Sequence, residues 1–179
     1  MLLGMADGRI VTIDDEGVTP RESGHRGVKA MTLDVTGKRL ISGGSEGTLI
    51  WYDLEAQSQV ARVEVHSTEI ATIVLSTTKD TVISADWDGH VKLTSAKDQK
   101  PVADFSQANA VSALVERDGV IVTGSWDGFV RVWRLTGDSA DLITEFDTGA
   151  PVFGTAVTAD GKSAATVSGS GEVDFWKLP

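Results

Sequence analysis

Short apolar runs separated by turn residues succeed one another along the whole chain, and no stretch shows the three-to-four-residue spacing of an amphipathic helix. The clearest example is TGSWDGFVRVWRL at residues 123–135, where an apolar run leads into the dipeptide Asp127-Gly128. This dipeptide is typical of a hairpin turn, because Asp bonds to its own backbone and Gly accepts positive φ. Beyond the turn, Val130, Val132 and Leu135 are apolar whereas Arg131 and Arg134 are polar, which is close to the period of a half-buried strand. The segment therefore predicts a β-hairpin.

The same hairpin recurs five times at a nearly constant interval. Aligned on the turn glycine, successive copies are separated by 39, 42, 39 and 43 residues. A period near 40 residues that is built from short strands predicts a β-propeller, in which each repeat forms one four-stranded blade. The turn glycines are Gly8, Gly47, Gly89, Gly128 and Gly171.

Each repeat contains strands that grade from apolar to polar, as expected for a sheet that runs from a central axis to a rim. The innermost strands are predicted at residues 28–33, 70–75, 111–115 and 152–157. The repeated turn joins the second and third strands of every blade. The more polar outermost strands are predicted at residues 59–65, 101–105 and 142–146. The pattern predicts an all-β chain of eighteen strands.

Particular dipeptides in these repeats resemble the WD-repeat β-propeller family. Gly24-His25 stands where the family has its Gly-His pair, and Tyr52-Asp53, Trp133-Arg134 and Trp176-Lys177 stand where its Trp-Asp pair ends the third strand. The resemblance covers essentially the whole chain. The literal Trp-Asp pairs at 87–88 and 126–127 are not this signature, because they lie in the turn before the third strand.

The resemblance implies a series of blades within one propeller region, residues 1–179. We expect a partial blade at 1–24, full blades at 25–65, 66–106 and 107–147, and a blade without its outer strand at 148–179. The ragged arrangement fits the C-terminal portion of a larger, seven-bladed ring. The remaining blades of its own propeller, or another chain, are therefore expected partners that complete the ring.

The resemblance also implies a hydrogen-bond network inside each blade. The nearest sets in this chain are incomplete: His25, Ser42, Glu46 and Tyr52; His66, Ser84 and Asp88, with Thr94 in place of tryptophan; Thr123, Asp127 and Trp133; and Thr166, Ser170 and Trp176. Ser84, His66 and Asp88 also hold the ingredients of a hydrolytic triad, but the neighbouring repeat has the same arrangement. We therefore interpret these residues as structural and expect no catalytic residues and no enzyme activity.

Composition narrows the possible partners. A formal net charge of −10 disfavours nucleic acid, whose binding requires clustered Lys and Arg. The absence of cysteine excludes a disulfide framework and a thiolate zinc site, and the three histidines lie in different repeats, so no metal site is expected. No cofactor is expected either, since no glycine-rich phosphate loop opens a helix. No apolar run approaches the length of a membrane span, which predicts no membrane partner and leaves the cytoplasm as the default location.

The strongest functional signal is the pair Trp87 and Trp126. Each lies two residues before the turn glycine of successive blades, where the other repeats have Ala6, Ser45 and Gly169, so the turn itself does not require tryptophan. The resemblance implies that this face binds peptides or partner proteins. Tryptophan also suits a binding hot spot, because it buries a large area with few rotatable bonds. The alternative is that each ring packs on a neighbouring turn or on the stems of Lys and Arg side chains.

Three further residues are predicted to add to the same face: Phe153, Arg26 and Lys29. The function predicted from the sequence is a non-catalytic scaffold that binds a peptide or partner protein within a multiprotein assembly. One alternative is that this region is the scaffold part of a larger protein that carries a catalytic or cofactor domain elsewhere. The other is a propeller that binds glycans or small molecules by stacking them on the aromatic rings.

Overall fold

The computed structural model describes residues 1–78, 80–136 and 139–179, and over these residues the chain folds into eighteen strands. Two of the predicted blades, 66–106 and 107–147, include the residues outside these ranges, namely 79 and 137–138. Every recorded strand pairing is antiparallel, and the strands form five sheets. The predicted all-β class is thus confirmed.

Three sheets have four strands and the two end sheets have three, as the sequence predicted. The first sheet holds β1 (Leu2–Gly4), β2 (Arg9–Asp14) and β3 (Gly17–Glu22). The second holds β4 (Val28–Leu33), β5 (Arg39–Gly44), β6 (Thr48–Asp53) and β7 (Ser58–Glu64), and the third holds β8 (Ile70–Leu75), β9 (Thr81–Asp86), β10 (His90–Ser95) and β11 (Pro101–Ser106). The fourth holds β12 (Val111–Arg117), β13 (Val120–Ser125), β14 (Phe129–Thr136) and β15 (Ser139–Asp147), and the last holds β16 (Val152–Val157), β17 (Ser163–Ser168) and β18 (Val173–Lys177).

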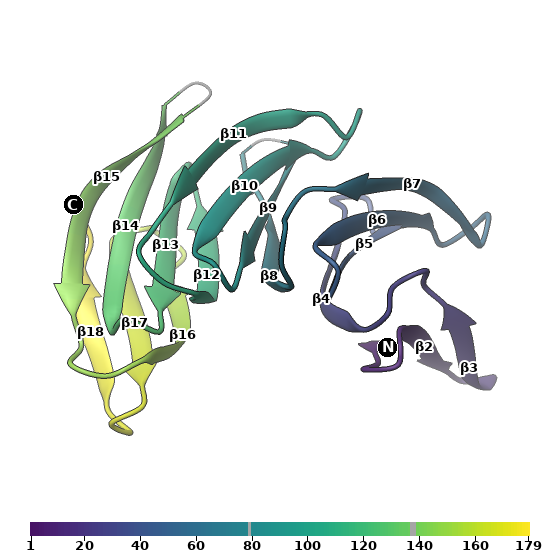
Figure 1. The fold of residues 1–179 in the computed structure, drawn as a ribbon, viewed down its shortest axis with the longest axis horizontal. Helices are drawn as coiled ribbons and strands as arrows, with labels where there is room; N and C mark the ends of the chain where they lie inside the picture. The colour runs from purple at the N-terminus through teal and green to yellow at the C-terminus, as the bar shows by residue number, and fades with distance from the viewer. Residues whose placement is uncertain (79, 137–138) are drawn as a thin grey trace.

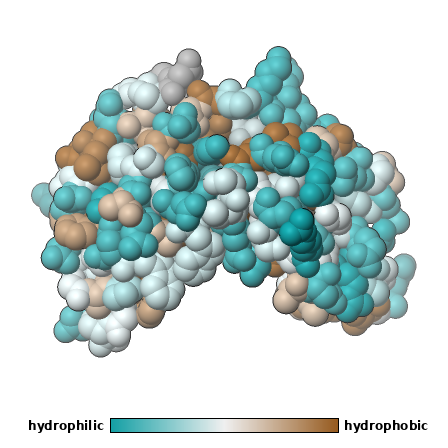
Figure 2. All heavy atoms as spheres, viewed as in Figure 1, coloured by the Kyte–Doolittle hydropathy of each residue, from teal (hydrophilic) through white to brown (hydrophobic). Residues whose placement is uncertain are grey.

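The five sheets stand side by side as blades of an open arc, with the two chain ends at opposite ends of it (Figure 1). The outermost strands β7, β11 and β15 lie along the convex side of the arc (Figure 1). Because the arc does not close over the described residues, the expected seven-bladed ring stays a prediction. Figure 2 shows the same view as an arch that is hollowed on one side, with a mostly hydrophilic surface and separate hydrophobic patches. Within the described part of the chain, no helix is long and apolar enough to cross a bilayer.

The repeated turn glycine connects each blade to the next. Gly47 and Gly89 have φ values of 78° and 89°, a region that glycine enters without strain. The carbonyl of Gly47 accepts a hydrogen bond of 2.9 Å from the backbone N–H of His66, and that of Gly89 accepts one of 3.0 Å from Gln107. A Cβ on Gly47 would collide with the carbonyl oxygen of His66. Only glycine therefore allows the chain that enters the next blade to pass so close to the turn.

Aromatic pairs fill two of the seams between blades. Phe105 on β11 contacts Trp133 on β14 with ring centroids 4.5 Å apart, and Phe146 on β15 stacks on Trp176 on β18 at 4.6 Å. In both seams the outer strand of one blade supplies the phenylalanine and the third strand of the following blade supplies the tryptophan. Trp133 is only 7% exposed, so its packing joins the third and fourth blades into one core.

Truncation of Trp133 is expected to destabilise the fold strongly. Trp133→Ala removes the ring that fills the seam and should lower the free energy of unfolding by about 3–5 kcal/mol, as for other buried aromatic side chains. The matched control is Trp126→Ala in the same hairpin, where the ring is 43% exposed and the expected cost is within about 1 kcal/mol. Chemical denaturation followed by circular dichroism measures both. Equal losses for the two variants would contradict this assignment.

Candidate partner-binding site

Three exposed aromatic side chains form a continuous row across the third, fourth and last blades. The rings of Trp87 and Trp126 lie 5.7 Å apart between centroids, and the ring of Phe153 lies edge-on to Trp126 at 5.9 Å. Their residues are 43%, 43% and 55% exposed. We call Trp87, Trp126 and Phe153 the aromatic row. Both tryptophan rings thus contact a neighbouring side chain, as in the alternative in which they only pack. That neighbour is aromatic, however, and all three rings stay exposed to solvent.

The row borders a shallow hollow of about 330 Å³ that is lined by Lys29, Glu69, Ala71, Ser112 and the three rings. Glu69 holds two of its neighbours in place. One carboxylate oxygen accepts a 3.2 Å hydrogen bond from the indole N–H of Trp87, and the other pairs with the Lys29 ammonium at 3.0 Å. The hollow therefore combines aromatic rings with an ion pair.

The repeat geometry explains why these side chains meet. In the last two blades the residue two before the turn glycine is held by its backbone: Trp126 N–H donates to the carbonyl of Ala110 at 3.1 Å, and Gly169 N–H donates to that of Pro151 at 2.8 Å. In the last blade the position is glycine, and a Cβ there would already be 3.5 Å from the ring of Phe153. Phe153 thus covers the place that tryptophan takes in the two preceding blades.

The structure brings together four of the five predicted site residues, and Arg26 is outside this set. Its backbone N–H donates to a carboxylate oxygen of Glu46 at 3.2 Å, and the residue is exposed. Arg26 does not line the hollow beside Lys29. The sequence analysis did not single out Glu69, although its position immediately before an innermost strand matches that of Ala110 and Pro151.

The buried network of the third blade differs from the predicted set in one residue. His66 contacts Ser84 Oγ through Nε2 at 2.8 Å and a carboxylate oxygen of Asp86 through Nδ1 at 3.0 Å. The predicted acid, Asp88, is exposed and only donates its backbone N–H to Asp86. The prediction was wrong because Asp86 ends β9 on the same face as Ser84, two residues away, whereas Asp88 lies out in the turn.

The second blade has the same Ser–His–acid arrangement, but its acid comes from a different position in the turn. Glu46 occupies the predicted position in the turn and its carboxylate contacts His25 Nδ1, while His25 Nε2 lies 3.0 Å from Ser42 Oγ. The residue equivalent to Asp86 is Gly44, and a side chain there would collide with both His25 and Glu46. The longer glutamate thus reaches back over a glycine to the place that an aspartate takes one blade later.

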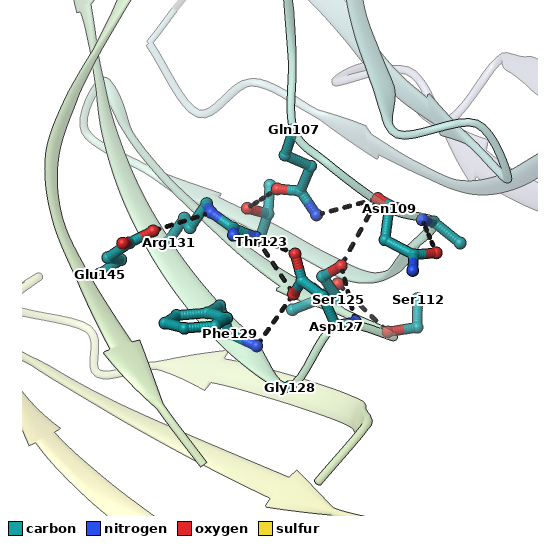
Figure 3. Close-up of polar contacts among 12 residues, drawn as sticks. Gln107, Asn109, Ser112, Thr123, Ser125, Asp127, Gly128, Phe129, Arg131 and Glu145 are labelled. Atoms are coloured by element: carbon teal, nitrogen blue, oxygen red, sulfur yellow. Dashed lines mark hydrogen bonds and ion pairs between the residues drawn. The ribbon is translucent and has the colours of Figure 1, made fainter. Parts of the chain in front are cut away.

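The fourth blade uses a residue that the sequence analysis missed. Thr123 Oγ1 accepts a 3.0 Å hydrogen bond from the indole N–H of Trp133. The same hydroxyl donates one of 2.7 Å to the Gln107 amide oxygen (Figure 3). Gln107 precedes its innermost strand by four residues, as His66 does, so repeat alignment could have found it.

The predicted turn acid Asp127 does not join this network. Its carboxylate instead pairs with Arg131 at 2.9 Å, and Arg131 also binds Glu145 at 3.0 Å (Figure 3). In the last blade, the indole N–H of Trp176 donates to Thr166 at 2.8 Å, whereas Ser170 bonds to Ser168 at 2.7 Å.

The Ser–His–acid sets are therefore parts of the sheet. Ser84 and Asp86 have no exposed surface and His66 is 7% exposed. A nucleophilic serine must be open to its substrate, and Ser84 is not. Its hydroxyl joins neighbouring strands, as the structural interpretation of the sequence required.

These observations define the class of the protein as a β-propeller built from repeated four-stranded blades, with an aromatic row on one face. Three segments match the family model described as "WD domain, G-beta repeat", at residues 18–53, 57–95 and 99–134. The chain therefore belongs to the WD-repeat family, and the family predicted from the sequence is confirmed. Each matched segment runs from the outermost strand of one blade to the third strand of the next.

Similar proteins and a similar solved structure support the same conclusion. WD repeat- and FYVE domain-containing protein 4 of Mus musculus is 32% identical over 123 residues, which are 62% of this chain and 4% of that protein. U3 small nucleolar RNA-associated protein 15 homolog of Xenopus tropicalis is 27% identical over 128 residues, 70% of this chain and 24% of that protein. The chain spans less than a quarter of the length of these two relatives. A chain of a structure titled "Crystal Structure of Mitotic Checkpoint Complex" superposes with a TM-score of 0.88 at 15% identity, over 99% of this chain and 60% of that one, which shows the fold.

Acidification is expected to destabilise the third blade through its buried network. Burial lowers the pKa of His66, so the folded state holds the neutral imidazole more firmly than the unfolded chain does. Its contribution to stability is present above about pH 6.5 and is lost progressively as the pH falls below that value. Burial alone would raise the pKa of Asp86, but the His90 backbone N–H and the neighbouring His66 hold it below its ordinary value, so its contribution is lost only at lower pH, below about 4.

The variant His66→Gln tests this assignment, because Gln107 already serves at the equivalent position one blade later. Glutamine does not titrate, so we expect a smaller loss of stability between pH 7.5 and 5.5 than in the unmodified protein. Urea denaturation at each pH measures the slope. An unchanged slope would show that His66 does not carry the pH dependence.

Proposed function

We propose that the chain is a non-catalytic interaction module that binds a peptide or partner protein on the aromatic row. The observation that carries the proposal is that three large rings lie exposed and in contact, although the turn positions do not require them. Exposed aromatic clusters of this kind supply most of the energy at protein interfaces, because their rings are already ordered and lose little entropy on binding. The Lys29–Glu69 pair would set the orientation of the bound segment.

Membership of the WD-repeat family supports a scaffold role inside a multiprotein assembly. The net charge of −10 supports a protein partner over nucleic acid, and a cytoplasmic location remains a prediction. A second candidate is that this region is the scaffold portion of a larger protein with a further domain. It is favoured by the chain's match to 4% of a relative whose name includes a FYVE domain. The two candidates are compatible, since a propeller can present the aromatic row in either context.

The last sheet supports the proposal that further blades or another chain complete the ring. Phe175 is 81% exposed and Val173 is 58% exposed. At the positions equivalent to Phe175 in the three preceding blades, Trp51, Leu93 and Val132 are at most 2% exposed, because a neighbouring sheet covers them. An uncovered apolar sheet face is prone to association.

The double variant Phe175→Asp/Val173→Asp is expected to suppress association of the 179-residue chain. A charge on each exposed position raises the cost of covering this face, so the fraction of monomer should rise. Light scattering across a concentration series measures it. The unsubstituted chain behaving as a stable monomer at every concentration would argue against a missing neighbour.

Loss of partner binding on truncation of the aromatic row is the direct test of the proposed function. Trp126→Ala and Trp87→Ala should each weaken a partner recovered by affinity purification by about 30-fold, the effect of losing one hot-spot residue. Leu142→Ala is the matched control, because this residue is 47% exposed and lies on β15, the outermost strand of the fourth blade. Quantitative mass spectrometry of the captured proteins measures the change. If both tryptophan variants retain every specific partner, the row is not the binding site.

A sugar array distinguishes the glycan alternative. Glycan binding that disappears in Trp126→Ala, without any loss of protein partners, would replace a protein ligand by a carbohydrate at the same surface.

A further inference from the structure

The seams between blades are filled in two different ways. The third/fourth seam holds the tilted pair Phe105–Trp133, and the fourth/last seam holds the stacked pair Phe146–Trp176. The first/second seam instead holds a cavity of about 320 Å³, and the second/third seam borders one of about 350 Å³.

Strand register shows that these cavities lie where the aromatic pairs lie elsewhere. Phe105 and Phe146 are each opposite the residue two after the turn glycine of their blade, namely Val91 and Val130. By the same register, the first blade has Arg21 opposite Ile10. The second blade has Tyr52 at the position of Trp133, ten residues after the serine or threonine of the buried network. Arg21 and Tyr52 both line the first cavity, so an arginine and a tyrosine replace the phenylalanine and the tryptophan.

The first cavity is lined by both apolar and polar residues, and the charged ones are Asp14, Arg21 and Glu22. Leu2, Ile10, Leu40 and Ile50 contribute to its walls, together with the hydroxyl-bearing Ser42. Its volume falls at the lower end of the range for small-molecule sites, roughly 300–1,000 Å³. Arg21 is held at the rim by a 2.7 Å hydrogen bond from its guanidinium to the Gln57 side-chain oxygen.

Ser42 is the counterpart of Thr123, which accepts the indole N–H of Trp133. The Glu46 carboxylate accepts a hydrogen bond from His25 Nδ1–H, so in the neutral ring Nε2 is the acceptor and Ser42 donates its hydroxyl hydrogen to it. Thr123 likewise donates to Gln107 while its oxygen accepts the indole N–H. A serine hydroxyl has two acceptor lone pairs, so the Ser42 oxygen can accept an N–H from the cavity.

We propose that the seam between the first and second blades is a binding site for a small planar aromatic molecule that carries a ring N–H, of the indole class. The ring lies in the cavity among the apolar side chains, beside the tyrosine that stands in place of tryptophan. Its N–H donates to Ser42 Oγ. The site is separate from the aromatic row and does not depend on the proposed function.

Thermal unfolding and calorimetry with indole test the proposal. Indole should raise the unfolding midpoint of the 179-residue chain by roughly 2–4 °C at a concentration well above its dissociation constant. 1-Methylindole has the same ring but no N–H, so it should bind roughly five-fold more weakly, the worth of one hydrogen bond. Ser42→Ala should remove this preference between the two ligands while leaving binding of 1-methylindole in place.

Two variants that fill the cavity complete the design. Tyr52→Trp restores the residue found at this position in the fourth and last blades and should abolish indole binding. Ile10→Phe fills the space from the first blade and serves if the first variant does not fold. Trp126→Ala is the control that should leave indole binding unchanged. The proposal is overturned if indole produces no shift, if both filling variants still bind it, or if Trp126→Ala abolishes binding.

Discussion

The close passage of the chain over each turn glycine is the constraint on which the rest of the structure depends. Gly8, Gly47, Gly89 and Gly128 all have positive φ, and the carbonyl of each accepts a backbone hydrogen bond from the segment that enters the next blade. This contact places His66 and Gln107 over their own sheets, so the buried networks form where they do. The period near 40 residues is thus the interval at which this hydrogen bond between blades recurs along the chain.

The residues on either side of the turn glycine have different roles in the structure. The residue two before the glycine is held by its backbone at Ser45, Trp126 and Gly169. Alanine, serine, glycine and tryptophan all occur at this position among the five repeats. The residue five after the glycine points into the seam, and its identity decides whether the seam is filled. Trp133 fills it, whereas Tyr52 and Thr94 border cavities. The two tryptophans of the hairpin at 123–135 therefore belong to different parts of the molecule, one to the core and one to the surface.

The sequence was sufficient for the fold because the pattern repeats. Strand positions, turn glycines and the eighteen-strand order all follow from period and alternation, which local physics enforces in every copy. The clustering of Trp87, Trp126, Phe153 and Lys29 followed as well, since equivalent positions of neighbouring blades share a face. The members of the buried hydrogen-bond networks were harder to predict from the sequence, because they depend on how far each side chain reaches. Asp86 in place of Asp88 becomes visible only when each side chain is placed on its face of the sheet. Gln107 stands at the repeat position of His66, but its hydrogen bond to Thr123 is seen only in the structure.

Site-specific photo-crosslinking tests the central claim, that the aromatic row is where a partner docks, most directly. A benzoylphenylalanine placed at position 126 samples the row, and the same group at position 142 samples the convex rim. The account predicts that the same partner is captured from position 126 and from position 87, and that position 142 captures it much less. A partner captured equally well from position 142, or never from position 126, would contradict it.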